Sequence, residues 1–318
     1  MYYKCQNGFI LLSFYVIYII TVVSGYSEGH ISSIKFESKV KPFDLKNIEN
    51  LIVFGDSFSQ VSTDLDDMTY TGENRSLGEN WPLILTKKYN LNLWNFAVSG
   101  AVIDNTIKMS KGKEFGDRWN GDNTLFAFWF GTNDILYINR TIYENGLDET
   151  YELMVDILSS KLDEIYNTGA RNLLFINTAS LDKFPSFRKI DKDTVLKNCE
   201  VFNNRLIKNT NDFYNGHNDT NVFIYDAYNE YNFIIENFKK YDFISPYDSF
   251  VNISFLGIDG FIWTDGLHPS RKTHKIMTND LELLINKNIK NISSASRNKK
   301  VTVIHHLISI SVILYLLF

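Results

Sequence analysis

The stretch that most constrains the fold is residues 51–60, LIVFGDSFSQ, in a chain of 318 residues. Four apolar residues lead into Gly55, Asp56 and Ser57, and an apolar run that stops at a glycine is typical of a buried strand ending in a tight turn. In an open α/β fold, the residue after such a strand lies at the carboxyl edge of the sheet, where ligands bind. Ser57 is therefore a candidate nucleophile, although Gly-Asp-Ser also serves as an ordinary turn that satisfies backbone groups.

The chain downstream of this strand alternates between strand-like and helical patterns. Further strands are expected at 91–97, 124–130, 171–177 and 221–226, and helices at 81–89, 149–167, 192–214, 227–240 and 271–289. Such alternation predicts a parallel sheet with helices on both faces. No internal repeat and no break in composition interrupts this region. We therefore expect one α/β domain over residues 45–290, with a five-stranded parallel sheet.

Composition excludes several classes of function. The net charge is −5 and no basic stripe is present, which argues against a nucleic-acid partner. Two cysteines, Cys5 and Cys199, are too few for a zinc ribbon or a disulfide scaffold. We expect Cys199 to be a small buried hydrophobe on a helix. Aromatic residues make up 15% of the chain, which fits a bulky core or a sugar-stacking surface.

The first residues have the pattern of a targeting segment. Within residues 1–25, Lys4 precedes an apolar run from 9 to 23, and the small residues Ser24 and Gly25 follow. This order predicts a secretory signal peptide cleaved after Gly25, with an uncleaved membrane anchor as the alternative. Residues 26–44 are polar and mixed, and we expect a leader that crosses the surface.

The last residues form a second targeting pattern, over 291–318. Small residues at 293–296 and a basic spacer at 297–300 precede an apolar tail at 301–318. This order predicts a signal for glycosylphosphatidylinositol attachment, which would anchor the protein to lipid. A transmembrane anchor is the alternative, disfavoured because the basic spacer would then face the lumen. The expected location is secreted, or on the extracellular face of the plasma membrane. Secretion is compatible with Asn-x-Ser/Thr sites at Asn74, Asn139, Asn218, Asn252 and Asn291.

A nucleophilic serine needs a base and a group that orients the base. Among the histidines between the two terminal segments, only His268 has a carboxylate three residues before it, Asp265, and a proline after it. One imidazole nitrogen could then bond Asp265 while the other faces Ser57, as in a serine triad. The alternative is a helix-capping loop with a surface histidine.

Two other polar turns follow predicted strands, at 99–100 and 133–134. The backbone N–H groups of Ser57 and Gly100 and the side-chain amide of Asn133 could supply the donors that a tetrahedral oxyanion requires. Gly100 suits this role because no side chain blocks the approach.

Four motifs in this order resemble the SGNH branch of the GDSL esterases and lipases. They are Gly-Asp-Ser at 55–57, Asn-Phe-Ala-Val-Ser-Gly at 95–100, Gly-Thr-Asn-Asp at 131–134 and Asp-Gly-Leu-His at 265–268. Phe58 departs from the leucine of the family name, at a position that carries no chemistry. The G-x-S-x-G elbow of the α/β-hydrolases is absent around Ser57.

The resemblance implies a three-layer, flavodoxin-like fold without metal or cofactor. Ser57 would be the nucleophile, His268 the base and Asp265 its orienter, with the oxyanion held by Ser57, Gly100 and Asn133. Asp56 would hold the nucleophile turn in shape.

Within the family, the motifs are most similar to fungal secreted acetylesterases of carbohydrate esterase family 16. The resemblance implies an acylated small molecule or oligosaccharide as substrate, with acetyl groups removed from plant-wall oligosaccharides. Trp119 and Trp263, both expected in loops at the active edge, are the tryptophans we expect near a sugar. The alternatives are a lipase or thioesterase acting on longer acyl esters, and a non-catalytic carbohydrate-binding surface protein.

Overall fold

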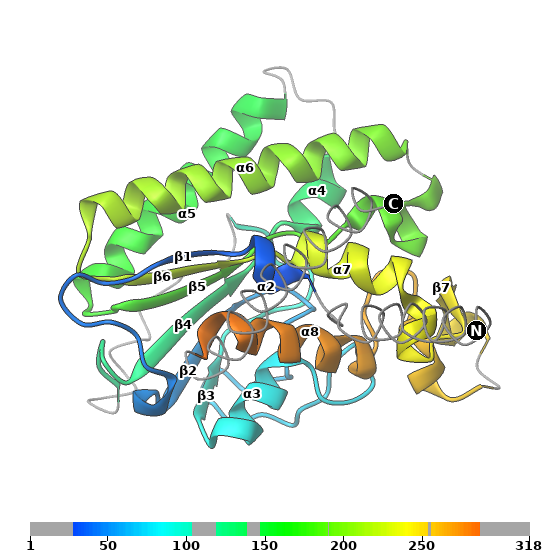
Figure 1. The fold of residues 1–318 in the computed structure, drawn as a ribbon, viewed down its shortest axis with the longest axis horizontal. Helices are drawn as coiled ribbons and strands as arrows, with labels where there is room; N and C mark the ends of the chain where they lie inside the picture. Colours follow the sequence, from blue (N-terminus) through cyan, green and yellow to red (C-terminus); the bar gives the residue numbers. More distant parts are fainter. Residues whose placement is uncertain (1–27, 104–118, 139–146, 190, 254–255, 287–318) are drawn as a thin grey trace, which may run out of the picture.

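The computed structural model describes residues 28–103, 119–138, 147–189, 191–253 and 256–286 (Figure 1). The expected signal peptide, the C-terminal tail and the acceptor sites Asn139 and Asn291 lie outside these ranges. Within them, a six-stranded sheet has the order β1-β6-β5-β4-β2-β3. Its strands are β1 (Ile34–Phe36), β2 (Asn50–Gly55), β3 (Asn92–Asn95), β4 (Thr124–Trp129), β5 (Asn172–Ile176) and β6 (Asn221–Tyr225).

The five predicted strands form the parallel part of this sheet, so the predicted fold class is confirmed. β2 pairs with both β3 and β4, and β5 joins β4 to β6, all in parallel. The sixth strand corrects the sequence analysis. β1 pairs antiparallel with β6, and a short helix, α2 (Gly29–Ser32), precedes it, within residues 26–44, where we expected a leader that crosses the surface. Three residues are too few to show a strand period, so only their pairing with β6 reveals β1.

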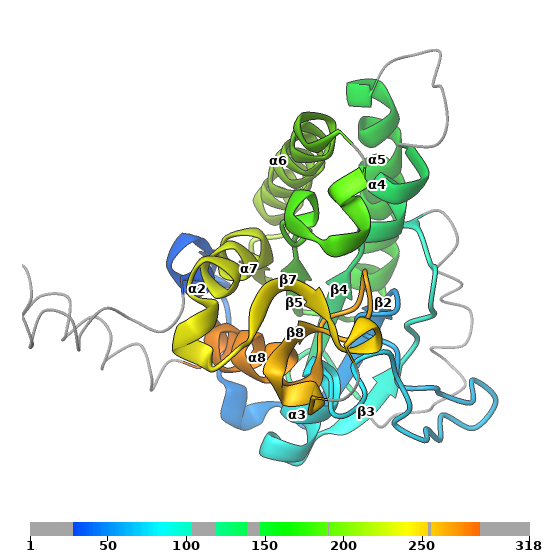
Figure 2. The same cartoon turned by 90° about the vertical axis from the view of Figure 1, so that its right-hand side faces the viewer.

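Helices cover both faces of the sheet, as the alternating pattern predicts. In Figures 1 and 2, α4, α5 and α6 lie over one face, and α2, α3, α7 and α8 lie over the other. The longer helices are α3 (Trp81–Tyr89), α4 (Thr132–Ile138), α5 (Leu147–Asn167), α6 (Lys192–Gly216), α7 (Ala227–Glu236) and α8 (Arg271–Ile285). A small parallel ribbon of β7 (Ser245–Ser249) and β8 (Phe261–Trp263) leads into α8.

The core of the sheet is rich in aromatic side chains. Every residue of β2 and β4 is buried. Phe96, Phe54, Phe128 and Phe175 stack across neighbouring strands, with ring centroids 5.3, 5.3 and 5.1 Å apart in that order. Each such pair contributes about 0.5–1.5 kcal/mol beyond the area that it buries. The turns at the carboxyl edge of β2 and β4 therefore follow strands that are fully buried and packed by aromatic rings.

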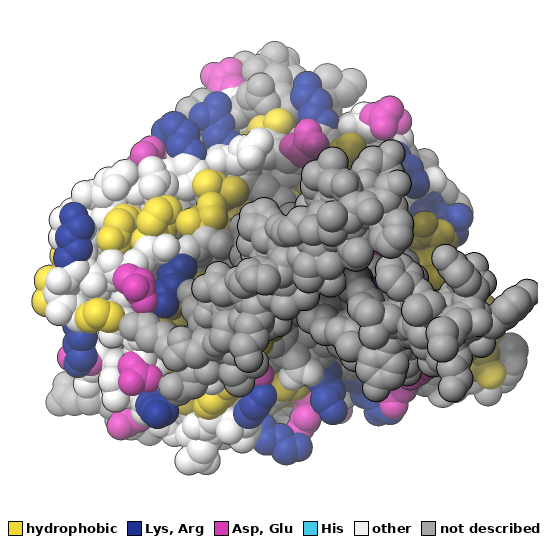
Figure 3. Space-filling model, in the orientation of Figure 1, with side chains coloured by type: hydrophobic (Ala, Val, Ile, Leu, Met, Phe, Trp, Pro, Cys, Tyr) yellow, Lys and Arg dark blue, Asp and Glu magenta, His cyan; other side chains and the backbone are white. Residues whose placement is uncertain are grey.

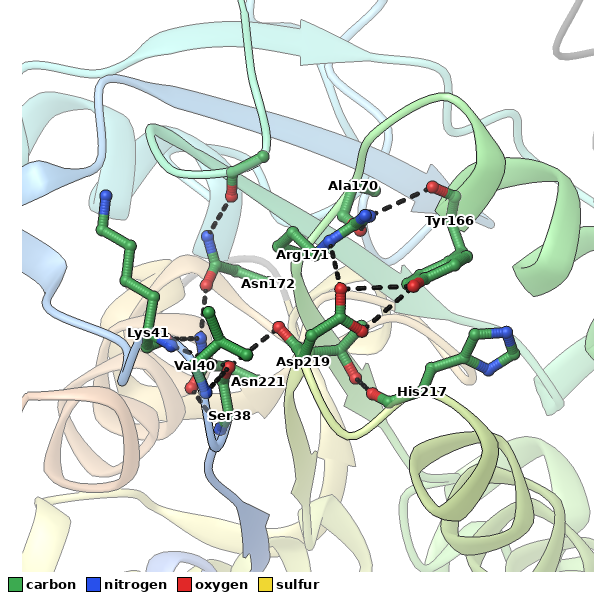
Figure 4. Close-up of polar contacts among 12 residues, drawn as sticks. Ser38, Val40, Lys41, Tyr166, Ala170, Arg171, Asn172, His217, Asp219 and Asn221 are labelled. Atoms are coloured by element: carbon green, nitrogen blue, oxygen red, sulfur yellow. Dashed lines mark hydrogen bonds and ion pairs between the residues drawn. The ribbon is translucent and has the colours of Figure 1, made fainter.

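Polar side chains hold the chain before β2 against the amino edge of the sheet (Figure 4). Asn221 accepts hydrogen bonds from the backbone N–H groups of Ser38 and Phe43, and its amide donates to the Lys41 carbonyl and to Asn172 Oδ1. All four bonds of the Asn221 amide are thus made within the protein. These polar groups fix the chain at the amino edge of the sheet, which is the edge opposite to Ser57.

Charges on the surface are mixed. In the view of Figure 3, Lys and Arg side chains lie among Asp and Glu side chains over the described part of this face. Cys199 is fully buried in α6, as predicted, and burial raises the pKa of its thiol to about 12. In the ranges given above, we find no helix with the length and hydrophobicity needed to cross a membrane.

Candidate active site

Ser57 lies directly after β2, in a turn that Asp56 organises. The Asp56 carbonyl accepts from the N–H groups of Ser59 and Gln60, and its Oδ1 accepts from the N–H of Phe58 at 2.9 Å. An aspartate that bonds the backbone two residues on makes a side-chain mimic of a turn. Asp56 therefore shapes the turn that presents Ser57, in agreement with the sequence analysis.

The structure brings His268 and Asp265 to Ser57. Nε2 of His268 lies 2.9 Å from the Ser57 hydroxyl oxygen, and Nδ1 lies 2.8 Å from Asp265 Oδ2. An ionised carboxylate only accepts hydrogen bonds, so Nδ1 carries the proton. In the neutral ring Nε2 is then free to accept the Ser57 proton. This is the hydrogen-bond order of a nucleophile, its base and the group that orients the base.

The loop that carries both residues is held by its own backbone. Asp265 Oδ1 accepts from the N–H groups of Leu267 and His268, at 2.8 and 2.9 Å. Burial opposes ionisation of Asp265, but the hydrogen bonds from the His268 ring and from these N–H groups outweigh it and hold its pKa at about 2. Asp265 is therefore ionised at neutral pH. The buried ring of Phe58 packs edge-on against the His268 ring, 6.0 Å between centroids.

The other described histidines lie elsewhere. His274 is buried in α8, where desolvation and, second, the nearby His268 lower its pKa to about 3. His30 bonds Asp280 from α2, and His217 ends α6 with its ring on the Phe213 carbonyl. Among the described histidines, only His268 forms a hydrogen bond with Ser57.

Gly100 sits in an exposed turn after β3 that is tied to the Ser57 turn, since Val98 N–H donates to the Gly55 carbonyl at 3.0 Å. Its φ is +82°, a conformation that side-chain-bearing residues rarely adopt. No atom lies within 4 Å of the position that a Cβ would take. Glycine is therefore required here by the backbone conformation, a reason additional to the open approach to the N–H that the sequence analysis gave. Among the described residues, the N–H groups of Ser57 and Gly100 donate to no protein acceptor.

Asn133 and Asp134 begin α4 and hold the Gly100 turn from the other side. Asn133 Nδ2 donates to the Ala101 carbonyl at 3.0 Å and approaches Asp56 Oδ2 at 3.4 Å. Asp134 accepts from the N–H of Ile103 and from the N–H of Gly131, both at 3.1 Å. The three turns are thus connected through one amide and two carboxyl groups. The sequence analysis gave Asp134 no role; its place beside Asn133 in the third motif was the available signal.

Both of these carboxyl groups are buried. Desolvation raises the pKa of Asp56 to about 7, partly offset by the Phe58 N–H, and the charge of Asp134 raises it further. Desolvation raises the pKa of Asp134 to about 6, against the opposing effect of the Ile103 and Gly131 N–H groups. The acids beside Asn133 therefore titrate near neutrality, whereas Asp265 does not.

The two tryptophans expected near a sugar are not in position to contact one. Trp263 has no exposed surface and lies in β8, where its indole N–H donates to the Pro246 carbonyl. Trp119 precedes β4 and packs edge-on against Phe126, 5.2 Å between centroids, near the amino edge of the sheet. Trp263 was misplaced because a loop position in a sequence does not tell which side chains the core buries, and Trp119 because it precedes its strand instead of following it.

No cluster of three or more His, Cys, Asp or Glu side chains suited to a metal ion occurs in the part of the chain that the structure describes. Ser57, His268, Asp265 and the amide donors around them are the groups that the structure brings together at this edge.

The chain is similar in sequence and fold to several known proteins. An acetylesterase from Thermothelomyces thermophilus is 25% identical over 170 residues, which cover 43% of this chain and 55% of that protein. The thermolabile hemolysin of Vibrio parahaemolyticus is 21% identical over 267 residues, 72% of this chain and 62% of that protein. The chain thus spans between half and two thirds of these relatives. An acetylxylan esterase structure from Geobacillus stearothermophilus is 14% identical, with a TM-score of 0.46 over 74% of this chain and 94% of that one.

The chain also matches the model of a protein family over a longer stretch than its match to the acetylesterase. The model of the family described as GDSL-like lipase/acylhydrolase matches residues 51–281. This stretch begins at the strand before Ser57 and includes the loop of Asp265 and His268. Because the match covers most of the chain, the protein belongs to the GDSL-like lipase/acylhydrolase family.

Proposed function

We propose that this protein is a serine carboxylic ester hydrolase, and that it removes acetyl groups from oligosaccharides. The observation that carries the proposal is the hydrogen-bond chain from Ser57 Oγ through the His268 ring to Asp265, with links of 2.9 and 2.8 Å. Family membership and the acetylesterase among its relatives support the choice of ester and acyl group.

The reaction follows from the positions of these atoms. Ser57 Oγ attacks the ester carbonyl carbon while its proton passes to His268 Nε2, and ionised Asp265 stabilises the imidazolium. The carbonyl oxygen becomes an oxyanion, held by the N–H groups of Ser57 and Gly100 and by the Asn133 amide. Asn133 can give up its long contact to Asp56 for this bond while it keeps the bond to Ala101.

The second half of the reaction returns the enzyme to its starting state. The tetrahedral intermediate collapses, the sugar alcohol leaves with the proton from His268, and the acetyl group stays on Ser57 Oγ. Water then attacks the acetyl carbon as His268 Nε2 takes one of its protons. That proton returns to Ser57 as acetate leaves, so one water is consumed for each ester cleaved.

Substitution of the nucleophile tests the reaction. Ser57→Ala should reduce acetate release from acetylated oligosaccharides and p-nitrophenyl acetate by at least about 10³-fold. Ser160→Ala, at an exposed serine on α5, is the matched control and should retain full activity. A fluorophosphonate should label the wild type and not Ser57→Ala. Wild-type turnover in Ser57→Ala would refute the assignment.

The acyl group is tested separately. A series of p-nitrophenyl esters of increasing chain length should be cleaved fastest at the acetate. A maximum at long chains would favour the lipase or thioesterase alternative and would leave the roles of Ser57 and His268 intact.

We also propose that the protein is secreted and held at the cell surface by a lipid anchor, from the patterns at residues 1–25 and 291–318. Expression of the full chain in a eukaryotic host, followed by phosphatidylinositol-specific phospholipase C, should release active enzyme from intact cells. Enzyme that stays with the membrane after this treatment would favour a transmembrane anchor.

A further inference from the structure

One exposed aromatic residue lies in the β7–β8 ribbon, which precedes the Asp265–His268 loop in the chain. Tyr247 lies in β7 and is 40% exposed. The Arg188 guanidinium lies over its ring, with the central carbon 4.9 Å from the ring centroid. Arg188 is itself exposed, in the short helix η6 (Pro185–Lys189). The two side chains form a stacked pair at the surface, held from two different elements.

One connection between this pair and the active site runs through η6. Ser186 N–H donates to the Gly266 carbonyl at 2.8 Å. The contact is close, since a Cβ on Gly266 would come within 2.4 Å of Ser186 Oγ. Arg188 begins about 4 Å further along this helix axis, at a rise of about 2 Å per residue. Gly266 precedes His268 by two residues, a span of at most about 7 Å.

The second connection runs through the β7–β8 ribbon. The Trp263 indole N–H donates to the carbonyl of Pro246, the neighbour of Tyr247, at 2.9 Å. Trp263 ends β8, two residues before Asp265, and its ring packs against the buried ring of Phe184 at 4.2 Å. Tyr247 is therefore carried by the same buried cluster that anchors the Asp265–His268 loop. In Figure 2 the segment of η6 and the ribbon lie side by side.

The chemistry of the pair suits a sugar. A pyranose ring has an apolar C–H face and a rim of hydroxyl groups. A tyrosine ring offers an apolar face of similar size on a side chain with few rotatable bonds, so little entropy is lost on contact. The guanidinium covers one face of this ring, so a sugar would stack on the opposite face, and the exposed carboxylate of Asp248 lies next in the chain. A long acyl chain would gain nothing from these polar groups.

The geometry points to the Tyr247–Arg188 pair as a subsite that binds a sugar ring of the oligosaccharide whose acetyl group reaches Ser57. The inference rests on the proposed function and adds to it the residues that select a sugar ester over a simple ester. It assigns to Tyr247 the stacking role that the sequence analysis gave to Trp263, which is buried.

The test compares two substrates in the full-length enzyme. The readout is the ratio of kcat/KM for an acetylated oligosaccharide to kcat/KM for p-nitrophenyl acetate. In Tyr247→Ala this ratio should fall about three- to tenfold, through KM, the effect of losing one aromatic contact. Tyr247→Phe keeps the ring and should retain the ratio. Arg188→Ala leaves β7 untouched and should lower the ratio by a smaller factor, which provides a second reading if Tyr247→Ala does not fold.

A matched control is Tyr70→Ala, at a tyrosine with the same 40% exposure in the turns after β2. Its ratio should equal that of the wild type. An unchanged ratio in both Tyr247→Ala and Arg188→Ala, or an equal fall in Tyr70→Ala, would overturn the subsite. So would a loss in Tyr247→Ala that grows with acyl chain length. These outcomes leave ester hydrolysis by Ser57 intact, whereas a wild type no more active than Ser57→Ala on either substrate would refute the proposed function itself.

Discussion

The hydroxyl oxygen of Ser57 lies 2.9 Å from Nε2 of His268, although 211 positions of sequence separate the two residues. Ser57 is placed by the end of β2 and His268 by the ribbon that leads into α8. Their contact therefore depends on the packing of that ribbon beside the carboxyl edge of the main sheet. Predictions about the site concern the groups that maintain this arrangement.

Asp265→Asn should abolish most activity without unfolding the protein. The amide of the variant would donate to Nδ1 of His268, so the ring proton would move to Nε2, which could no longer accept the Ser57 proton. We expect kcat on p-nitrophenyl acetate to fall by about 10⁴-fold, with an unchanged circular dichroism spectrum. Activity within tenfold of the wild type would show that Asp265 does not orient the base.

Asn133→Ala should remove one oxyanion donor and free one end of the Gly100 turn. Loss of one such donor reduces kcat by about 10²–10³-fold. KM should change little, because the bond strengthens as charge develops on the oxygen. Steady-state kinetics on p-nitrophenyl acetate provide the measurement. A rise in KM with unchanged kcat would assign Asn133 to substrate binding alone.

Asp134→Asn tests the buried carboxyl that joins Ile103 to Gly131. Both carboxyl oxygens accept N–H groups, so the amide of the variant loses one bond, at a cost of about 1–3 kcal/mol. The folded-state pKa of Asp134 is raised from 3.8 to about 6. Its contribution to stability is therefore full below pH 3.8 and is lost as the pH rises through about 6.

The variant lacks this titration, so the stability difference between wild type and Asp134→Asn should narrow between pH 4 and pH 7. Removing the Asp134 charge also lowers the raised pKa of Asp56 in the variant. The variant therefore loses less stability than the wild type as the pH rises, which narrows the difference further. Urea unfolding at the two pH values measures the difference. A stability difference between the two proteins that stays constant or widens from pH 4 to pH 7 would contradict the raised pKa of Asp134.

Gly131→Ala should destabilise the start of α4. Gly131 has a φ of +113°, and a Cβ there would lie 2.4 Å from Thr178 Cγ2 and 2.8 Å from the Phe202 ring. Backbone strain and overpacking together predict a loss of at least about 1–3 kcal/mol, with lower kcat because Asn133 shifts. Gly216→Ala is the control, since nothing lies within 4 Å of its Cβ position. Equal unfolding midpoints for the two variants would refute the prediction.

The sequence alone was sufficient for the five parallel strands, for the helices α3, α5, α6, α7 and α8, and for the four motifs, whereas α2 and α4 were not predicted. Strand and helix periods are local, so residues 124–130 and 149–167 were recognisable without their neighbours. The helix from Trp81 to Tyr89 was predicted with its observed bounds. The pairing of His268 with Ser57 was also predicted, because His268 alone among the candidate histidines has a carboxylate three residues before it and a proline after it.

Tertiary structure decided what depends on contacts between distant segments. β1 exists because β6 offers a free edge, Trp263 is buried because Phe184 and Tyr231 enclose it, and Asp134 matters because Ile103 reaches it. Such contacts leave no periodic trace in a single sequence, since each joins residues whose spacing along the chain is arbitrary. The sequence therefore identified the candidate catalytic groups, and only packing determined which surfaces remain exposed to a substrate.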